Sequence, residues 1–172
     1  MSVAEHKKER QPINCFIITV SDTRTADTDK SGQLMACMLT DAQHHVVHKK
    51  IVSDDVSAIR QTMFEACQTS NVDVILLNGG TGIAGRDVTI EAVSPMLDKE
   101  MPGFGEIFRM LSYQEDIGSA AILSRALAGI RGHIPIYVTP GSSGAVKLAM
   151  HKLILPELNH VVNEATKDNK RD

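Results

Sequence analysis

The sequence predicts an α/β fold in which helices cover both faces of a mostly parallel sheet. Runs of consecutive apolar residues, each as long as a buried strand, alternate with segments whose apolar residues recur at helical spacing. Turns rich in glycine, hydroxyl or carboxylate residues follow several of these runs. The chain has 172 residues and no internal repeat, low-complexity tract or interior linker, so we expect one domain.

The elements in the first third of the chain alternate between strand and helix. The charged residues 1–12 predict a flexible tail before a domain that spans residues 13–166. Asn14–Val20 predicts a buried strand and Gly32–Thr40 a modest helix. His45–Val52 is less apolar, which predicts a strand nearer an edge of the sheet.

A capped helix and another buried strand come next. Ser53–Asp55 can cap that helix. One face of the helix is apolar and carries Val56, Ile59, Met63 and Cys67. Val72–Leu77 is apolar and rich in β-branched residues, which predicts a strand buried on both faces. Thr89–Leu97 then shows the apolar spacing of a helix.

The second half of the chain is less regular. Met101–Glu106 contains a proline and two glycines and is expected to break the chain before a helix. The apolar spacing of that helix is given by Phe104, Ile107, Phe108 and Leu111. Ile117–Arg131 fits either a strand pair or a helix, whereas Ile134–Thr139 predicts a strand. The last helix is broken or restarted at Pro156 and ends in a charged tail, 167–172.

The stretch Asn78–Glu91 has the composition of an anion-binding loop. Its glycines let a ligand approach the main chain closely, and amides exposed at such a turn bind anions. Arg86 and Asp87 add a cation and a carboxylate, and the carboxylate becomes useful if a divalent metal ion bridges it to phosphate oxygens. The alternative is a plain connection with a surface ion pair. The match of Gly80–Gly85 to GxGxxG is weak, because the helix begins only near Thr89.

Four loops are expected to meet at one edge of the sheet. Parallel α/β sheets bind ligands beyond the carboxyl ends of their strands. The segments that follow the predicted strands are Ser21–Thr25, Ser53–Asp55, Asn78–Asp87 and Pro140–Ser143. Together they supply hydroxyls, carboxylates, glycine amides and an arginine, which suits a phosphate or nucleotide site.

Composition excludes several other classes. A net charge of −3 without a basic stripe argues against nucleic acid as the main partner. The sequence has no apolar run long enough to span a membrane and no secretory signal. Three widely spaced cysteines fit a reducing cytoplasm and show no metal-ligand spacing. With no Trp, two Tyr and four Phe, the chain offers few stacking platforms for a flavin.

An ordered set of motifs resembles the MoaB/MogA family of molybdenum cofactor biosynthesis, which includes the gephyrin G-type domains. The motifs are Ser21-Asp22-Thr23, Gly79-Gly80-Thr81-Gly82, Arg86-Asp87-Val88-Thr89, Pro102-Gly103-Phe104-Gly105-Glu106, Ile122-Leu123-Ser124-Arg125 and Pro140-Gly141-Ser142. The resemblance runs from about Phe16 to about Val162 and is strongest to the MoaB branch. It implies a Rossmann-like, three-layer molybdopterin-binding fold that assembles as a homo-trimer or hexamer.

The resemblance also implies an activity, the adenylylation of molybdopterin. In that reaction the terminal phosphate of molybdopterin attacks the α-phosphorus of ATP, with Mg²⁺ required, to give adenylyl-molybdopterin and pyrophosphate. The product would pass to a MoeA-type partner that inserts the metal. An alternative is a non-catalytic molybdopterin carrier of the same pathway, and a third reading is a scaffold. The loop carboxylate Asp87 favours the enzyme.

Site residues are carried over from the family by their motifs. Asp54 and Asp87 are expected to be catalytic and to hold Mg²⁺, while either Asp54 or Asp55 could serve only as a helix cap, and Asp54 is favoured as the functional one of the two. The residues expected to bind nucleotide or molybdopterin are Ser21, Asp22, Thr23, Gly79, Gly80, Thr81, Gly82, Arg86, Pro102, Gly103, Glu106, Ser124, Arg125, Pro140, Gly141 and Ser142. Arg125 could equally lie in a subunit interface, and Phe104, Phe108 and Met110 in a subunit interface or a core.

Overall fold

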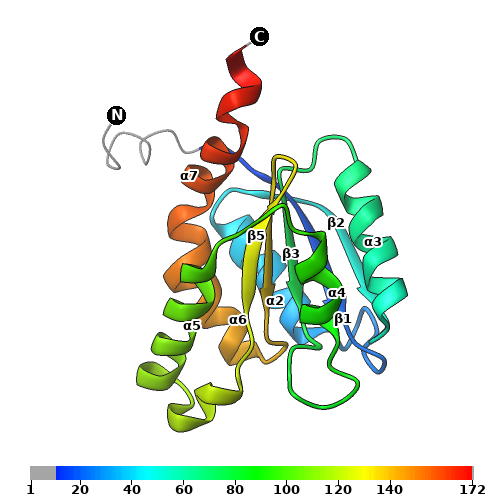
Figure 1. Ribbon diagram of the computed structural model, residues 1–172, viewed down its shortest axis with the longest axis vertical. Coiled ribbons are helices and arrows are strands. Elements are labelled where there is room, and N and C mark those ends of the chain that lie inside the picture. The colour runs from blue at the N-terminus through cyan, green and yellow to red at the C-terminus, as the bar shows by residue number, and fades with distance from the viewer. Residues whose placement is uncertain (1–10, 172) are drawn as a thin grey trace.

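A six-stranded sheet with helices on both faces forms the protein, as the computed structural model shows for residues 11–171 (Figure 1). The strand order is β2-β1-β3-β6-β5-β4. The strands are Asn14–Val20 (β1), His45–Val52 (β2), Val74–Asn78 (β3), Lys99–Glu100 (β4), Leu127–Arg131 (β5) and Ile134–Thr139 (β6). β2, β1, β3 and β6 are parallel, whereas β5 is antiparallel to both of its neighbours. The predicted α/β class and mostly parallel sheet are confirmed.

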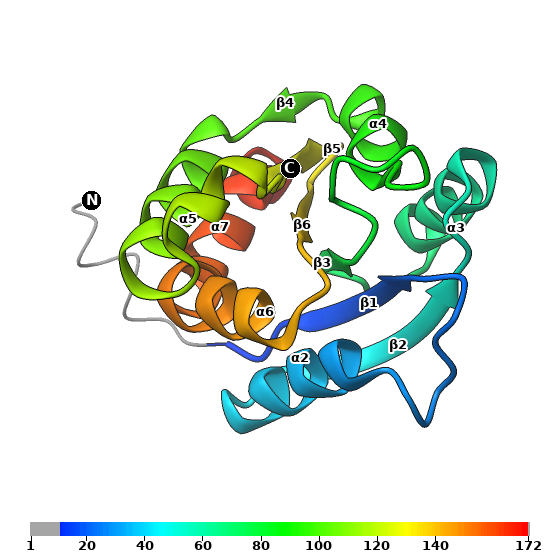
Figure 2. The same ribbon diagram turned by 90° about the horizontal axis from the view of Figure 1, so that it is seen from below.

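The helices divide between the two faces of the sheet. They are Lys30–Asp41 (α2), Val56–Gln68 (α3), Thr89–Val93 (α4), Pro102–Glu115 (α5), Ser143–Ala149 (α6) and Leu155–Thr166 (α7). Shorter helical segments are Ser94–Met96 (η1), Gly118–Leu123 (η2), Met150–Ile154 (η3) and Lys167–Arg171 (η4). Viewed from below, α3 and α4 lie on one side of the sheet and α2, α5, α6 and α7 on the other (Figure 2).

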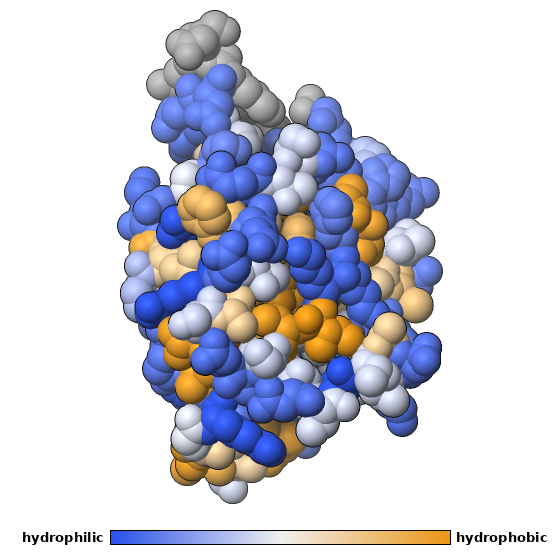
Figure 3. Space-filling model, turned by 90° about the vertical axis from the view of Figure 1, so that its right-hand side faces the viewer, coloured by the Kyte–Doolittle hydropathy of each residue, from blue (hydrophilic) through white to orange (hydrophobic). Residues whose placement is uncertain are grey.

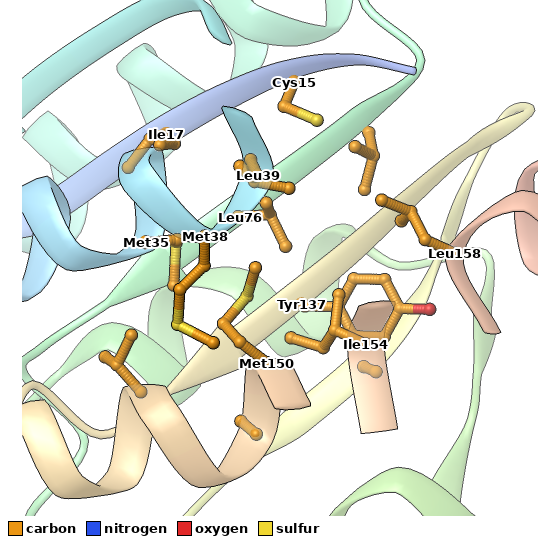
Figure 4. Packing of buried hydrophobic residues seen from close by; sticks show 14 of the residues in the cluster. Cys15, Ile17, Met35, Met38, Leu39, Leu76, Tyr137, Met150, Ile154 and Leu158 are labelled. Carbon is orange, nitrogen blue, oxygen red and sulfur yellow. The ribbon is translucent and has the colours of Figure 1, made fainter. Parts of the chain in front are cut away.

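The alternation of side chains along β1 explains the two cores. Cys15 and Ile17 point into the cluster beneath α2, α6 and α7, where Met35 and Leu158 also pack (Figure 4). Phe16 and Ile18 point into the opposite cluster, beneath α3 and α4. A strand buried on both faces must be apolar at every position, and β1 is. The outer surface on the α3 side is mainly hydrophilic, with apolar residues near its centre and in smaller groups toward its edges (Figure 3).

The four predicted strands correspond to β1, β2, β3 and β6, and they and the edge position of β2 are confirmed, with small shifts in bounds. Several other predictions were wrong. Met101–Glu106 does not break the chain, because Pro102 stands in the first turn of α5, where a missing backbone N–H costs nothing. Ile117–Arg131 is neither alternative, since η2 is followed by one strand, β5.

The C-terminal part is one continuous helical run. α6 passes through the π-helical segment η3 into α7, and Pro156 sits in the first turn of α7, as a restart. The charged end was predicted to be a tail, but η4 extends the helix to Arg171. Most of the predicted N-terminal tail lies outside the described residues. Gln11 is described, and its N–H donates to Asn159 Oδ1 at 2.9 Å. Among the helices of the described chain, none is long and apolar enough to cross a membrane.

The sequence left open whether three residues of α5 lie in the core or in a subunit interface, and the structure gives them different environments. Phe108 is fully buried and Phe104 packs beside it, with ring centroids 6.3 Å apart. Met110 on the same helix is 50% exposed. Phe108 therefore belongs to the core, and the exposed side of α5 carries Ile107, Met110 and Tyr113.

We predict that Phe108→Ala lowers the free energy of unfolding by about 3–5 kcal/mol, because it removes a fully buried ring and leaves a cavity. The matched control is Gln114→Ala on the exposed side of the same helix, which should change it by less than about 0.5 kcal/mol. Urea unfolding monitored by circular dichroism measures both. A loss below 1 kcal/mol for Phe108→Ala would contradict its assigned place in the core.

Candidate functional site

A cavity of about 600 Å³ opens at the carboxyl ends of β1, β2, β3 and β6. It lies beside the point where the chain leaves β2 and crosses to β3, on the other side of β1, which is where open α/β sheets bind ligands. Its wall includes parts of all four loops that the sequence predicted to meet there. The longest of them, between β3 and α4, hangs below the sheet in Figure 1.

The glycine loop begins with two backbone conformations that side chains disfavour. Gly79 has φ +96° and Gly80 φ +63°. A Cβ on Gly79 would overlap the carbonyl oxygen of Val20, and a Cβ on Gly141 would lie 2.9 Å from the Cα of Gly79. The Gly79 N–H also donates to the carbonyl of Thr139 at 3.1 Å. The backbones that leave β1, β3 and β6 therefore touch at this point, which only glycine permits.

Asp54 is held by a reciprocal pair of hydrogen bonds with the first loop. The Asp22 N–H donates to Asp54 Oδ2 at 3.0 Å, and the Asp54 N–H donates to Asp22 Oδ1 at 2.9 Å. The neighbouring Asp55 is the helix cap, since its carboxylate accepts from the Ala58 N–H at 2.8 Å. Asp54 is thus free of capping and faces the cavity, so the two adjacent carboxylates have different roles.

The environment of Asp54 opposes its negative charge. Burial raises the pKa of this carboxyl, and the carboxylates of Asp22 and Asp87 raise it further. The Asp22 N–H and the Arg86 cation act in the opposite direction but do not cancel the rise. A site that opposes the ionisation of Asp54 in this way favours a bound cation beside it.

Asp87 lies on the glycine loop and folds back over it. Its Oδ2 accepts from the Ala84 N–H at 3.1 Å, and a Cβ on Gly82 would lie 2.6 Å from that oxygen. A Cβ on Gly80 would likewise lie 2.9 Å from Asp54 Oδ1. Gly80 and Gly82 therefore leave room for the two carboxylates that were predicted to be catalytic.

Two carboxylates suit a Mg²⁺ ion that is also bound by substrate, rather than a metal ion held by protein ligands alone. Among residues 11–171, no group of three His, Cys, Asp or Glu residues could hold a metal ion. Mg²⁺ is commonly bound by one or two carboxylates, with waters and substrate phosphates completing its shell. Asp54 and Asp87 fit that donor set, beside a loop whose amides and Arg86 can take up phosphate.

Arg125 does not line the cavity but clamps the glycine loop from outside. Its Nε donates to the carbonyl of Thr81 at 2.9 Å, and its Nη2 donates to the carbonyls of Gly82 at 2.8 Å and Asp87 at 3.1 Å. Its guanidinium also pairs with Glu91, whose pKa is lowered by that hydrogen bond. All three guanidinium nitrogens of this arginine donate to partners within the chain, so it positions the loop.

Arg86 is different, because it is exposed on the cavity wall and makes no hydrogen bond or ion pair with the described residues. It can therefore reach a phosphate. The other predicted residues that line the cavity are Ser21, Asp22, Thr23, Gly79, Gly80, Thr81, Gly82, Ser124, Pro140, Gly141 and Ser142. Ser142 has a structural role as well, since it caps α6 by accepting from the Ala145 N–H at 3.2 Å.

Three predicted residues stand elsewhere. Pro102, Gly103 and Glu106 form the first turns of α5 and do not line the cavity of this chain. Their motif is consistent with a helix start, because proline at that position lacks only an N–H that would have no partner within the helix.

Sequence reasoning missed part of the cavity wall. The polar residues that it did not name as ligand-binding are Thr19, Arg24, Ser31 and Asn78, although Arg24 and Asn78 lie within the loops that were predicted to meet. The apolar ones are Val20, Ile117, Ala120 and Leu123. Thr19 and Asn78 are polar residues at the ends of apolar strands, a signal that could have been used. Nothing local marks Ser31 or η2, which reach the cavity only because α2 and η2 pack against the sheet edge.

Comparisons with known proteins agree with this geometry. Residues 16–160 match the family model described as "Probable molybdopterin binding domain". Molybdenum cofactor biosynthesis protein B of Bacillus subtilis (strain 168) is 61% identical over 169 residues, which cover 98% of this chain and 99% of that protein. The same-named protein of Staphylococcus carnosus (strain TM300) is 55% identical over 157 residues, covering 90% and 92%.

Solved structures agree as well. A crystal structure of Molybdenum cofactor biosynthesis protein B superposes with a TM-score of 0.91 at 55% identity, covering 93% of this chain and 99% of that chain. The tungsten cofactor synthesizing protein MoaB from Pyrococcus furiosus superposes with a TM-score of 0.81 at 39% identity, covering 91% and 99%. The resemblance read from the motifs is confirmed, and the chain belongs to the molybdopterin-binding domain family of molybdenum cofactor biosynthesis.

Proposed function

We propose that this protein transfers the adenylyl group of ATP to molybdopterin in a Mg²⁺-dependent reaction. The observation that carries the proposal is the meeting of Asp54 and Asp87 at one cavity, beside a glycine loop and the uncommitted Arg86. A protein that only bound molybdopterin would need the glycine loop and the Arg86 cation, but not the two carboxylates. Two carboxylates beside a phosphate site add repulsion unless a metal ion is shared with the ligand.

The proposed step forms one P–O bond and breaks another. A phosphate oxygen of molybdopterin attacks the α-phosphorus of ATP, the α–β anhydride bond breaks, and pyrophosphate leaves. The attacking phosphate monoester is already anionic, so the protein needs to align and neutralise rather than remove a proton. Asp54 and Asp87 would hold Mg²⁺, which supplies charge neutralisation on the phosphate oxygens.

The other residues take supporting roles in this proposal. Amides of Gly79 to Gly82 and the guanidinium of Arg86 would contact phosphate oxygens. Hydroxyls of the first loop, Ser124 and the Pro140–Ser142 turn would line the substrates. Arg125 and Glu91 would hold the loop that carries Asp87. Pro102, Gly103 and Glu106 have no part in the site as we propose it.

We also propose that the protein is a cytoplasmic homo-oligomer, trimeric or hexameric, that hands its product to a MoeA-type protein for metal insertion. Exposed apolar residues support an interface between copies: Ile107, Met110 and Tyr113 of α5 continue to Ile117 and to Ile122 of η2, which is 84% exposed. Single apolar residues on a surface need no explanation, but a grouped set indicates contact with another molecule.

The proposed function is tested most directly by the reaction itself. Purified protein mixed with molybdopterin, Mg²⁺ and ATP labelled at the α-phosphate should give labelled adenylyl-molybdopterin and an equal amount of pyrophosphate. Chromatography of the labelled products measures it, and chelation of Mg²⁺ should stop it. If no product forms while molybdopterin still binds in a titration, the protein is a molybdopterin carrier and the transferase proposal fails.

Neutralising either carboxylate should remove activity without harming the fold. We expect Asp87→Asn and Asp54→Asn each to lower the rate of transfer by about 10²–10³-fold, since each removes charge that holds Mg²⁺ at the phosphates. Asn keeps an oxygen that can accept from the Ala84 or Asp22 N–H, so the melting temperature should not fall. Asp54→Asn should also weaken turnover more than molybdopterin binding.

The matched control is Asp55→Asn at the cap of α3, because asparagine caps as well as aspartate. It should leave both activity and melting temperature nearly unchanged. A loss of activity as large as that of Asp54→Asn would show that the position of α3, not the carboxylate, is what matters.

The clamp on the glycine loop gives a separate prediction. Arg125→Lys keeps the charge but cannot donate to three carbonyls and Glu91 together. We expect kcat to fall by about 10- to 100-fold as Asp87 moves from its place, with a smaller change in KM for molybdopterin. Steady-state kinetics measures both. A rise in KM with unchanged kcat would instead indicate that Arg125 contacts substrate.

A further inference from the structure

A chain of hydrogen-bonded polar side chains, buried except for the half-buried Arg24, runs along the wall of the cavity. Thr19 donates to Asp29 Oδ2 at 2.8 Å, and the Asn78 amide nitrogen donates to Thr19 Oγ1 at 3.1 Å. Ser31 donates to Asn78 Oδ1 at 2.9 Å, and Arg24 Nη1 donates to Ser31 Oγ at 3.3 Å. Four of the five side chains line the cavity, and only the carboxylate of Asp29 lies behind it. The chain links the first loop, β1, β3 and α2.

All hydrogen bonds in this chain point the same way, and one group sets the direction. An ionised carboxylate only accepts, so Thr19 must donate to Asp29 and is left to accept from the amide of Asn78. The carbonyl end of Asn78 then faces Ser31, which donates to it and accepts from Arg24. A negative charge that is fully buried therefore fixes the orientation of a cation at the cavity wall.

The carboxylate at the base of the chain is built into the fold. Asp29 is 0% exposed, caps α2 by accepting from the Gly32 N–H at 2.9 Å, and has the ammonium of Lys49 at 3.5 Å. A Cβ on Gly32 would overlap Asp29 Oδ2 and would lie 2.6 Å from Thr19 Oγ1. A buried charge persists only when it is paired and hydrogen-bonded, as Asp29 is.

The outer end of the chain is a cation with unused donors. Arg24 and Arg86 are the two cationic side chains on the wall of the cavity within residues 11–171. Arg24 donates to Ser31 through Nη1, and the other nitrogens of its guanidinium have no hydrogen-bond partner among those residues. It sits on the loop after β1, whereas Arg86 sits on the loop after β3, so the two can approach an anion from different loops.

We propose that Arg24 binds a phosphate group of the ligand, and that Thr19, Asn78 and Ser31 are positioning residues that hold its guanidinium from the buried Asp29. This inference rests on the proposed function for the identity of the ligands, ATP and molybdopterin. It assigns a contact that no motif of the sequence marked. A planar guanidinium fixed on one edge presents its remaining N–H groups as a fork, which suits phosphate oxygens.

Calorimetric titration of the full chain with three probes tests the contact: ATP with Mg²⁺, molybdopterin and inorganic pyrophosphate. We expect Arg24→Ala to weaken binding of at least one of them about 10- to 100-fold, the effect of losing a charge-assisted hydrogen-bonded pair. Lys30→Ala is the matched control, because Lys30 is an exposed cation near the same loop that does not line the cavity. It should change each affinity less than about twofold.

The positioning role is tested by a double-mutant cycle. Thr19→Val removes the hydroxyl at constant shape and should weaken binding about three- to tenfold, whereas Thr19→Ser should restore most of the affinity. In an Arg24→Ala background Thr19→Val should add nothing, because its effect passes through Arg24. Ser31→Ala replaces Thr19→Val in the cycle if the latter fails to fold by circular dichroism.

The outcomes separate this inference from the proposed function. If wild type binds the probes and Arg24→Ala binds them equally well, the inference is overturned and the proposed function stands. If Thr19→Val costs the same with and without Arg24, the positioning role is overturned. If wild type binds molybdopterin alone, the transferase proposal fails, and Arg24 is judged by molybdopterin affinity. If wild type binds none of the three, both are overturned.

Discussion

The contact of three backbones at Gly79 is the constraint on which the site depends. There the end of β3 passes against the carbonyl of Val20 from β1 and the Cα of Gly141 after β6, and donates to Thr139. Any side chain at this point would push the strand ends apart. Because the strands are parallel and end together, their loops then share one cavity, and residues more than a hundred positions apart in sequence become its walls.

The charged groups in and around the cavity divide into those that are used within the chain and those that remain for a ligand. Asp55 and Asp29 cap helices, Arg125 holds the glycine loop, and Glu91 neutralises Arg125. These groups are satisfied within the chain and are unavailable to a ligand. What remains for a ligand is a small set of carboxylates and two arginines, and the pKa of Asp54 is raised by its burial first and by the nearby carboxylates second. Such a combination is stabilised when a cation and an anion arrive together.

Beneath these groups the last row of the sheet is polar, although it is buried. Thr19, Asn78 and Thr139 are paired in register across β1, β3 and β6, and each is at most 1% exposed. A fully satisfied polar row in a core gives up apolar burial but holds its side chains in one orientation. Here the polar row lies between the two apolar clusters and the cavity. The packing of the core therefore fixes where the loops leave the sheet.

The sequence by itself determined the α/β class, the four parallel strands, the loops that meet and most of the cavity residues, because strand-length apolar runs and glycine turns are local signals. It also carried the family motifs. It did not reveal the antiparallel strands β4 and β5, since Lys99–Glu100 is too short and polar and Leu127–Arg131 is set in the sheet by its pairing with β4 and β6. Nor could it assign Arg125, whose charge suits a phosphate as well as it suits carbonyls.

Only the tertiary structure decided which polar residues face a ligand and which are used inside the protein. Asp54 and Asp55 are neighbours in sequence, yet one lies at the cavity and the other caps a helix, because the Asp22 backbone captures the first and α3 begins after the second. Arg125, which its motif assigned to the ligand, is used on the glycine loop for the same reason, whereas the guanidinium of Arg24 keeps nitrogens without a partner among the described residues. A side chain's donors are spent on whichever partners the fold brings within hydrogen-bond distance, and those partners come from distant parts of the chain.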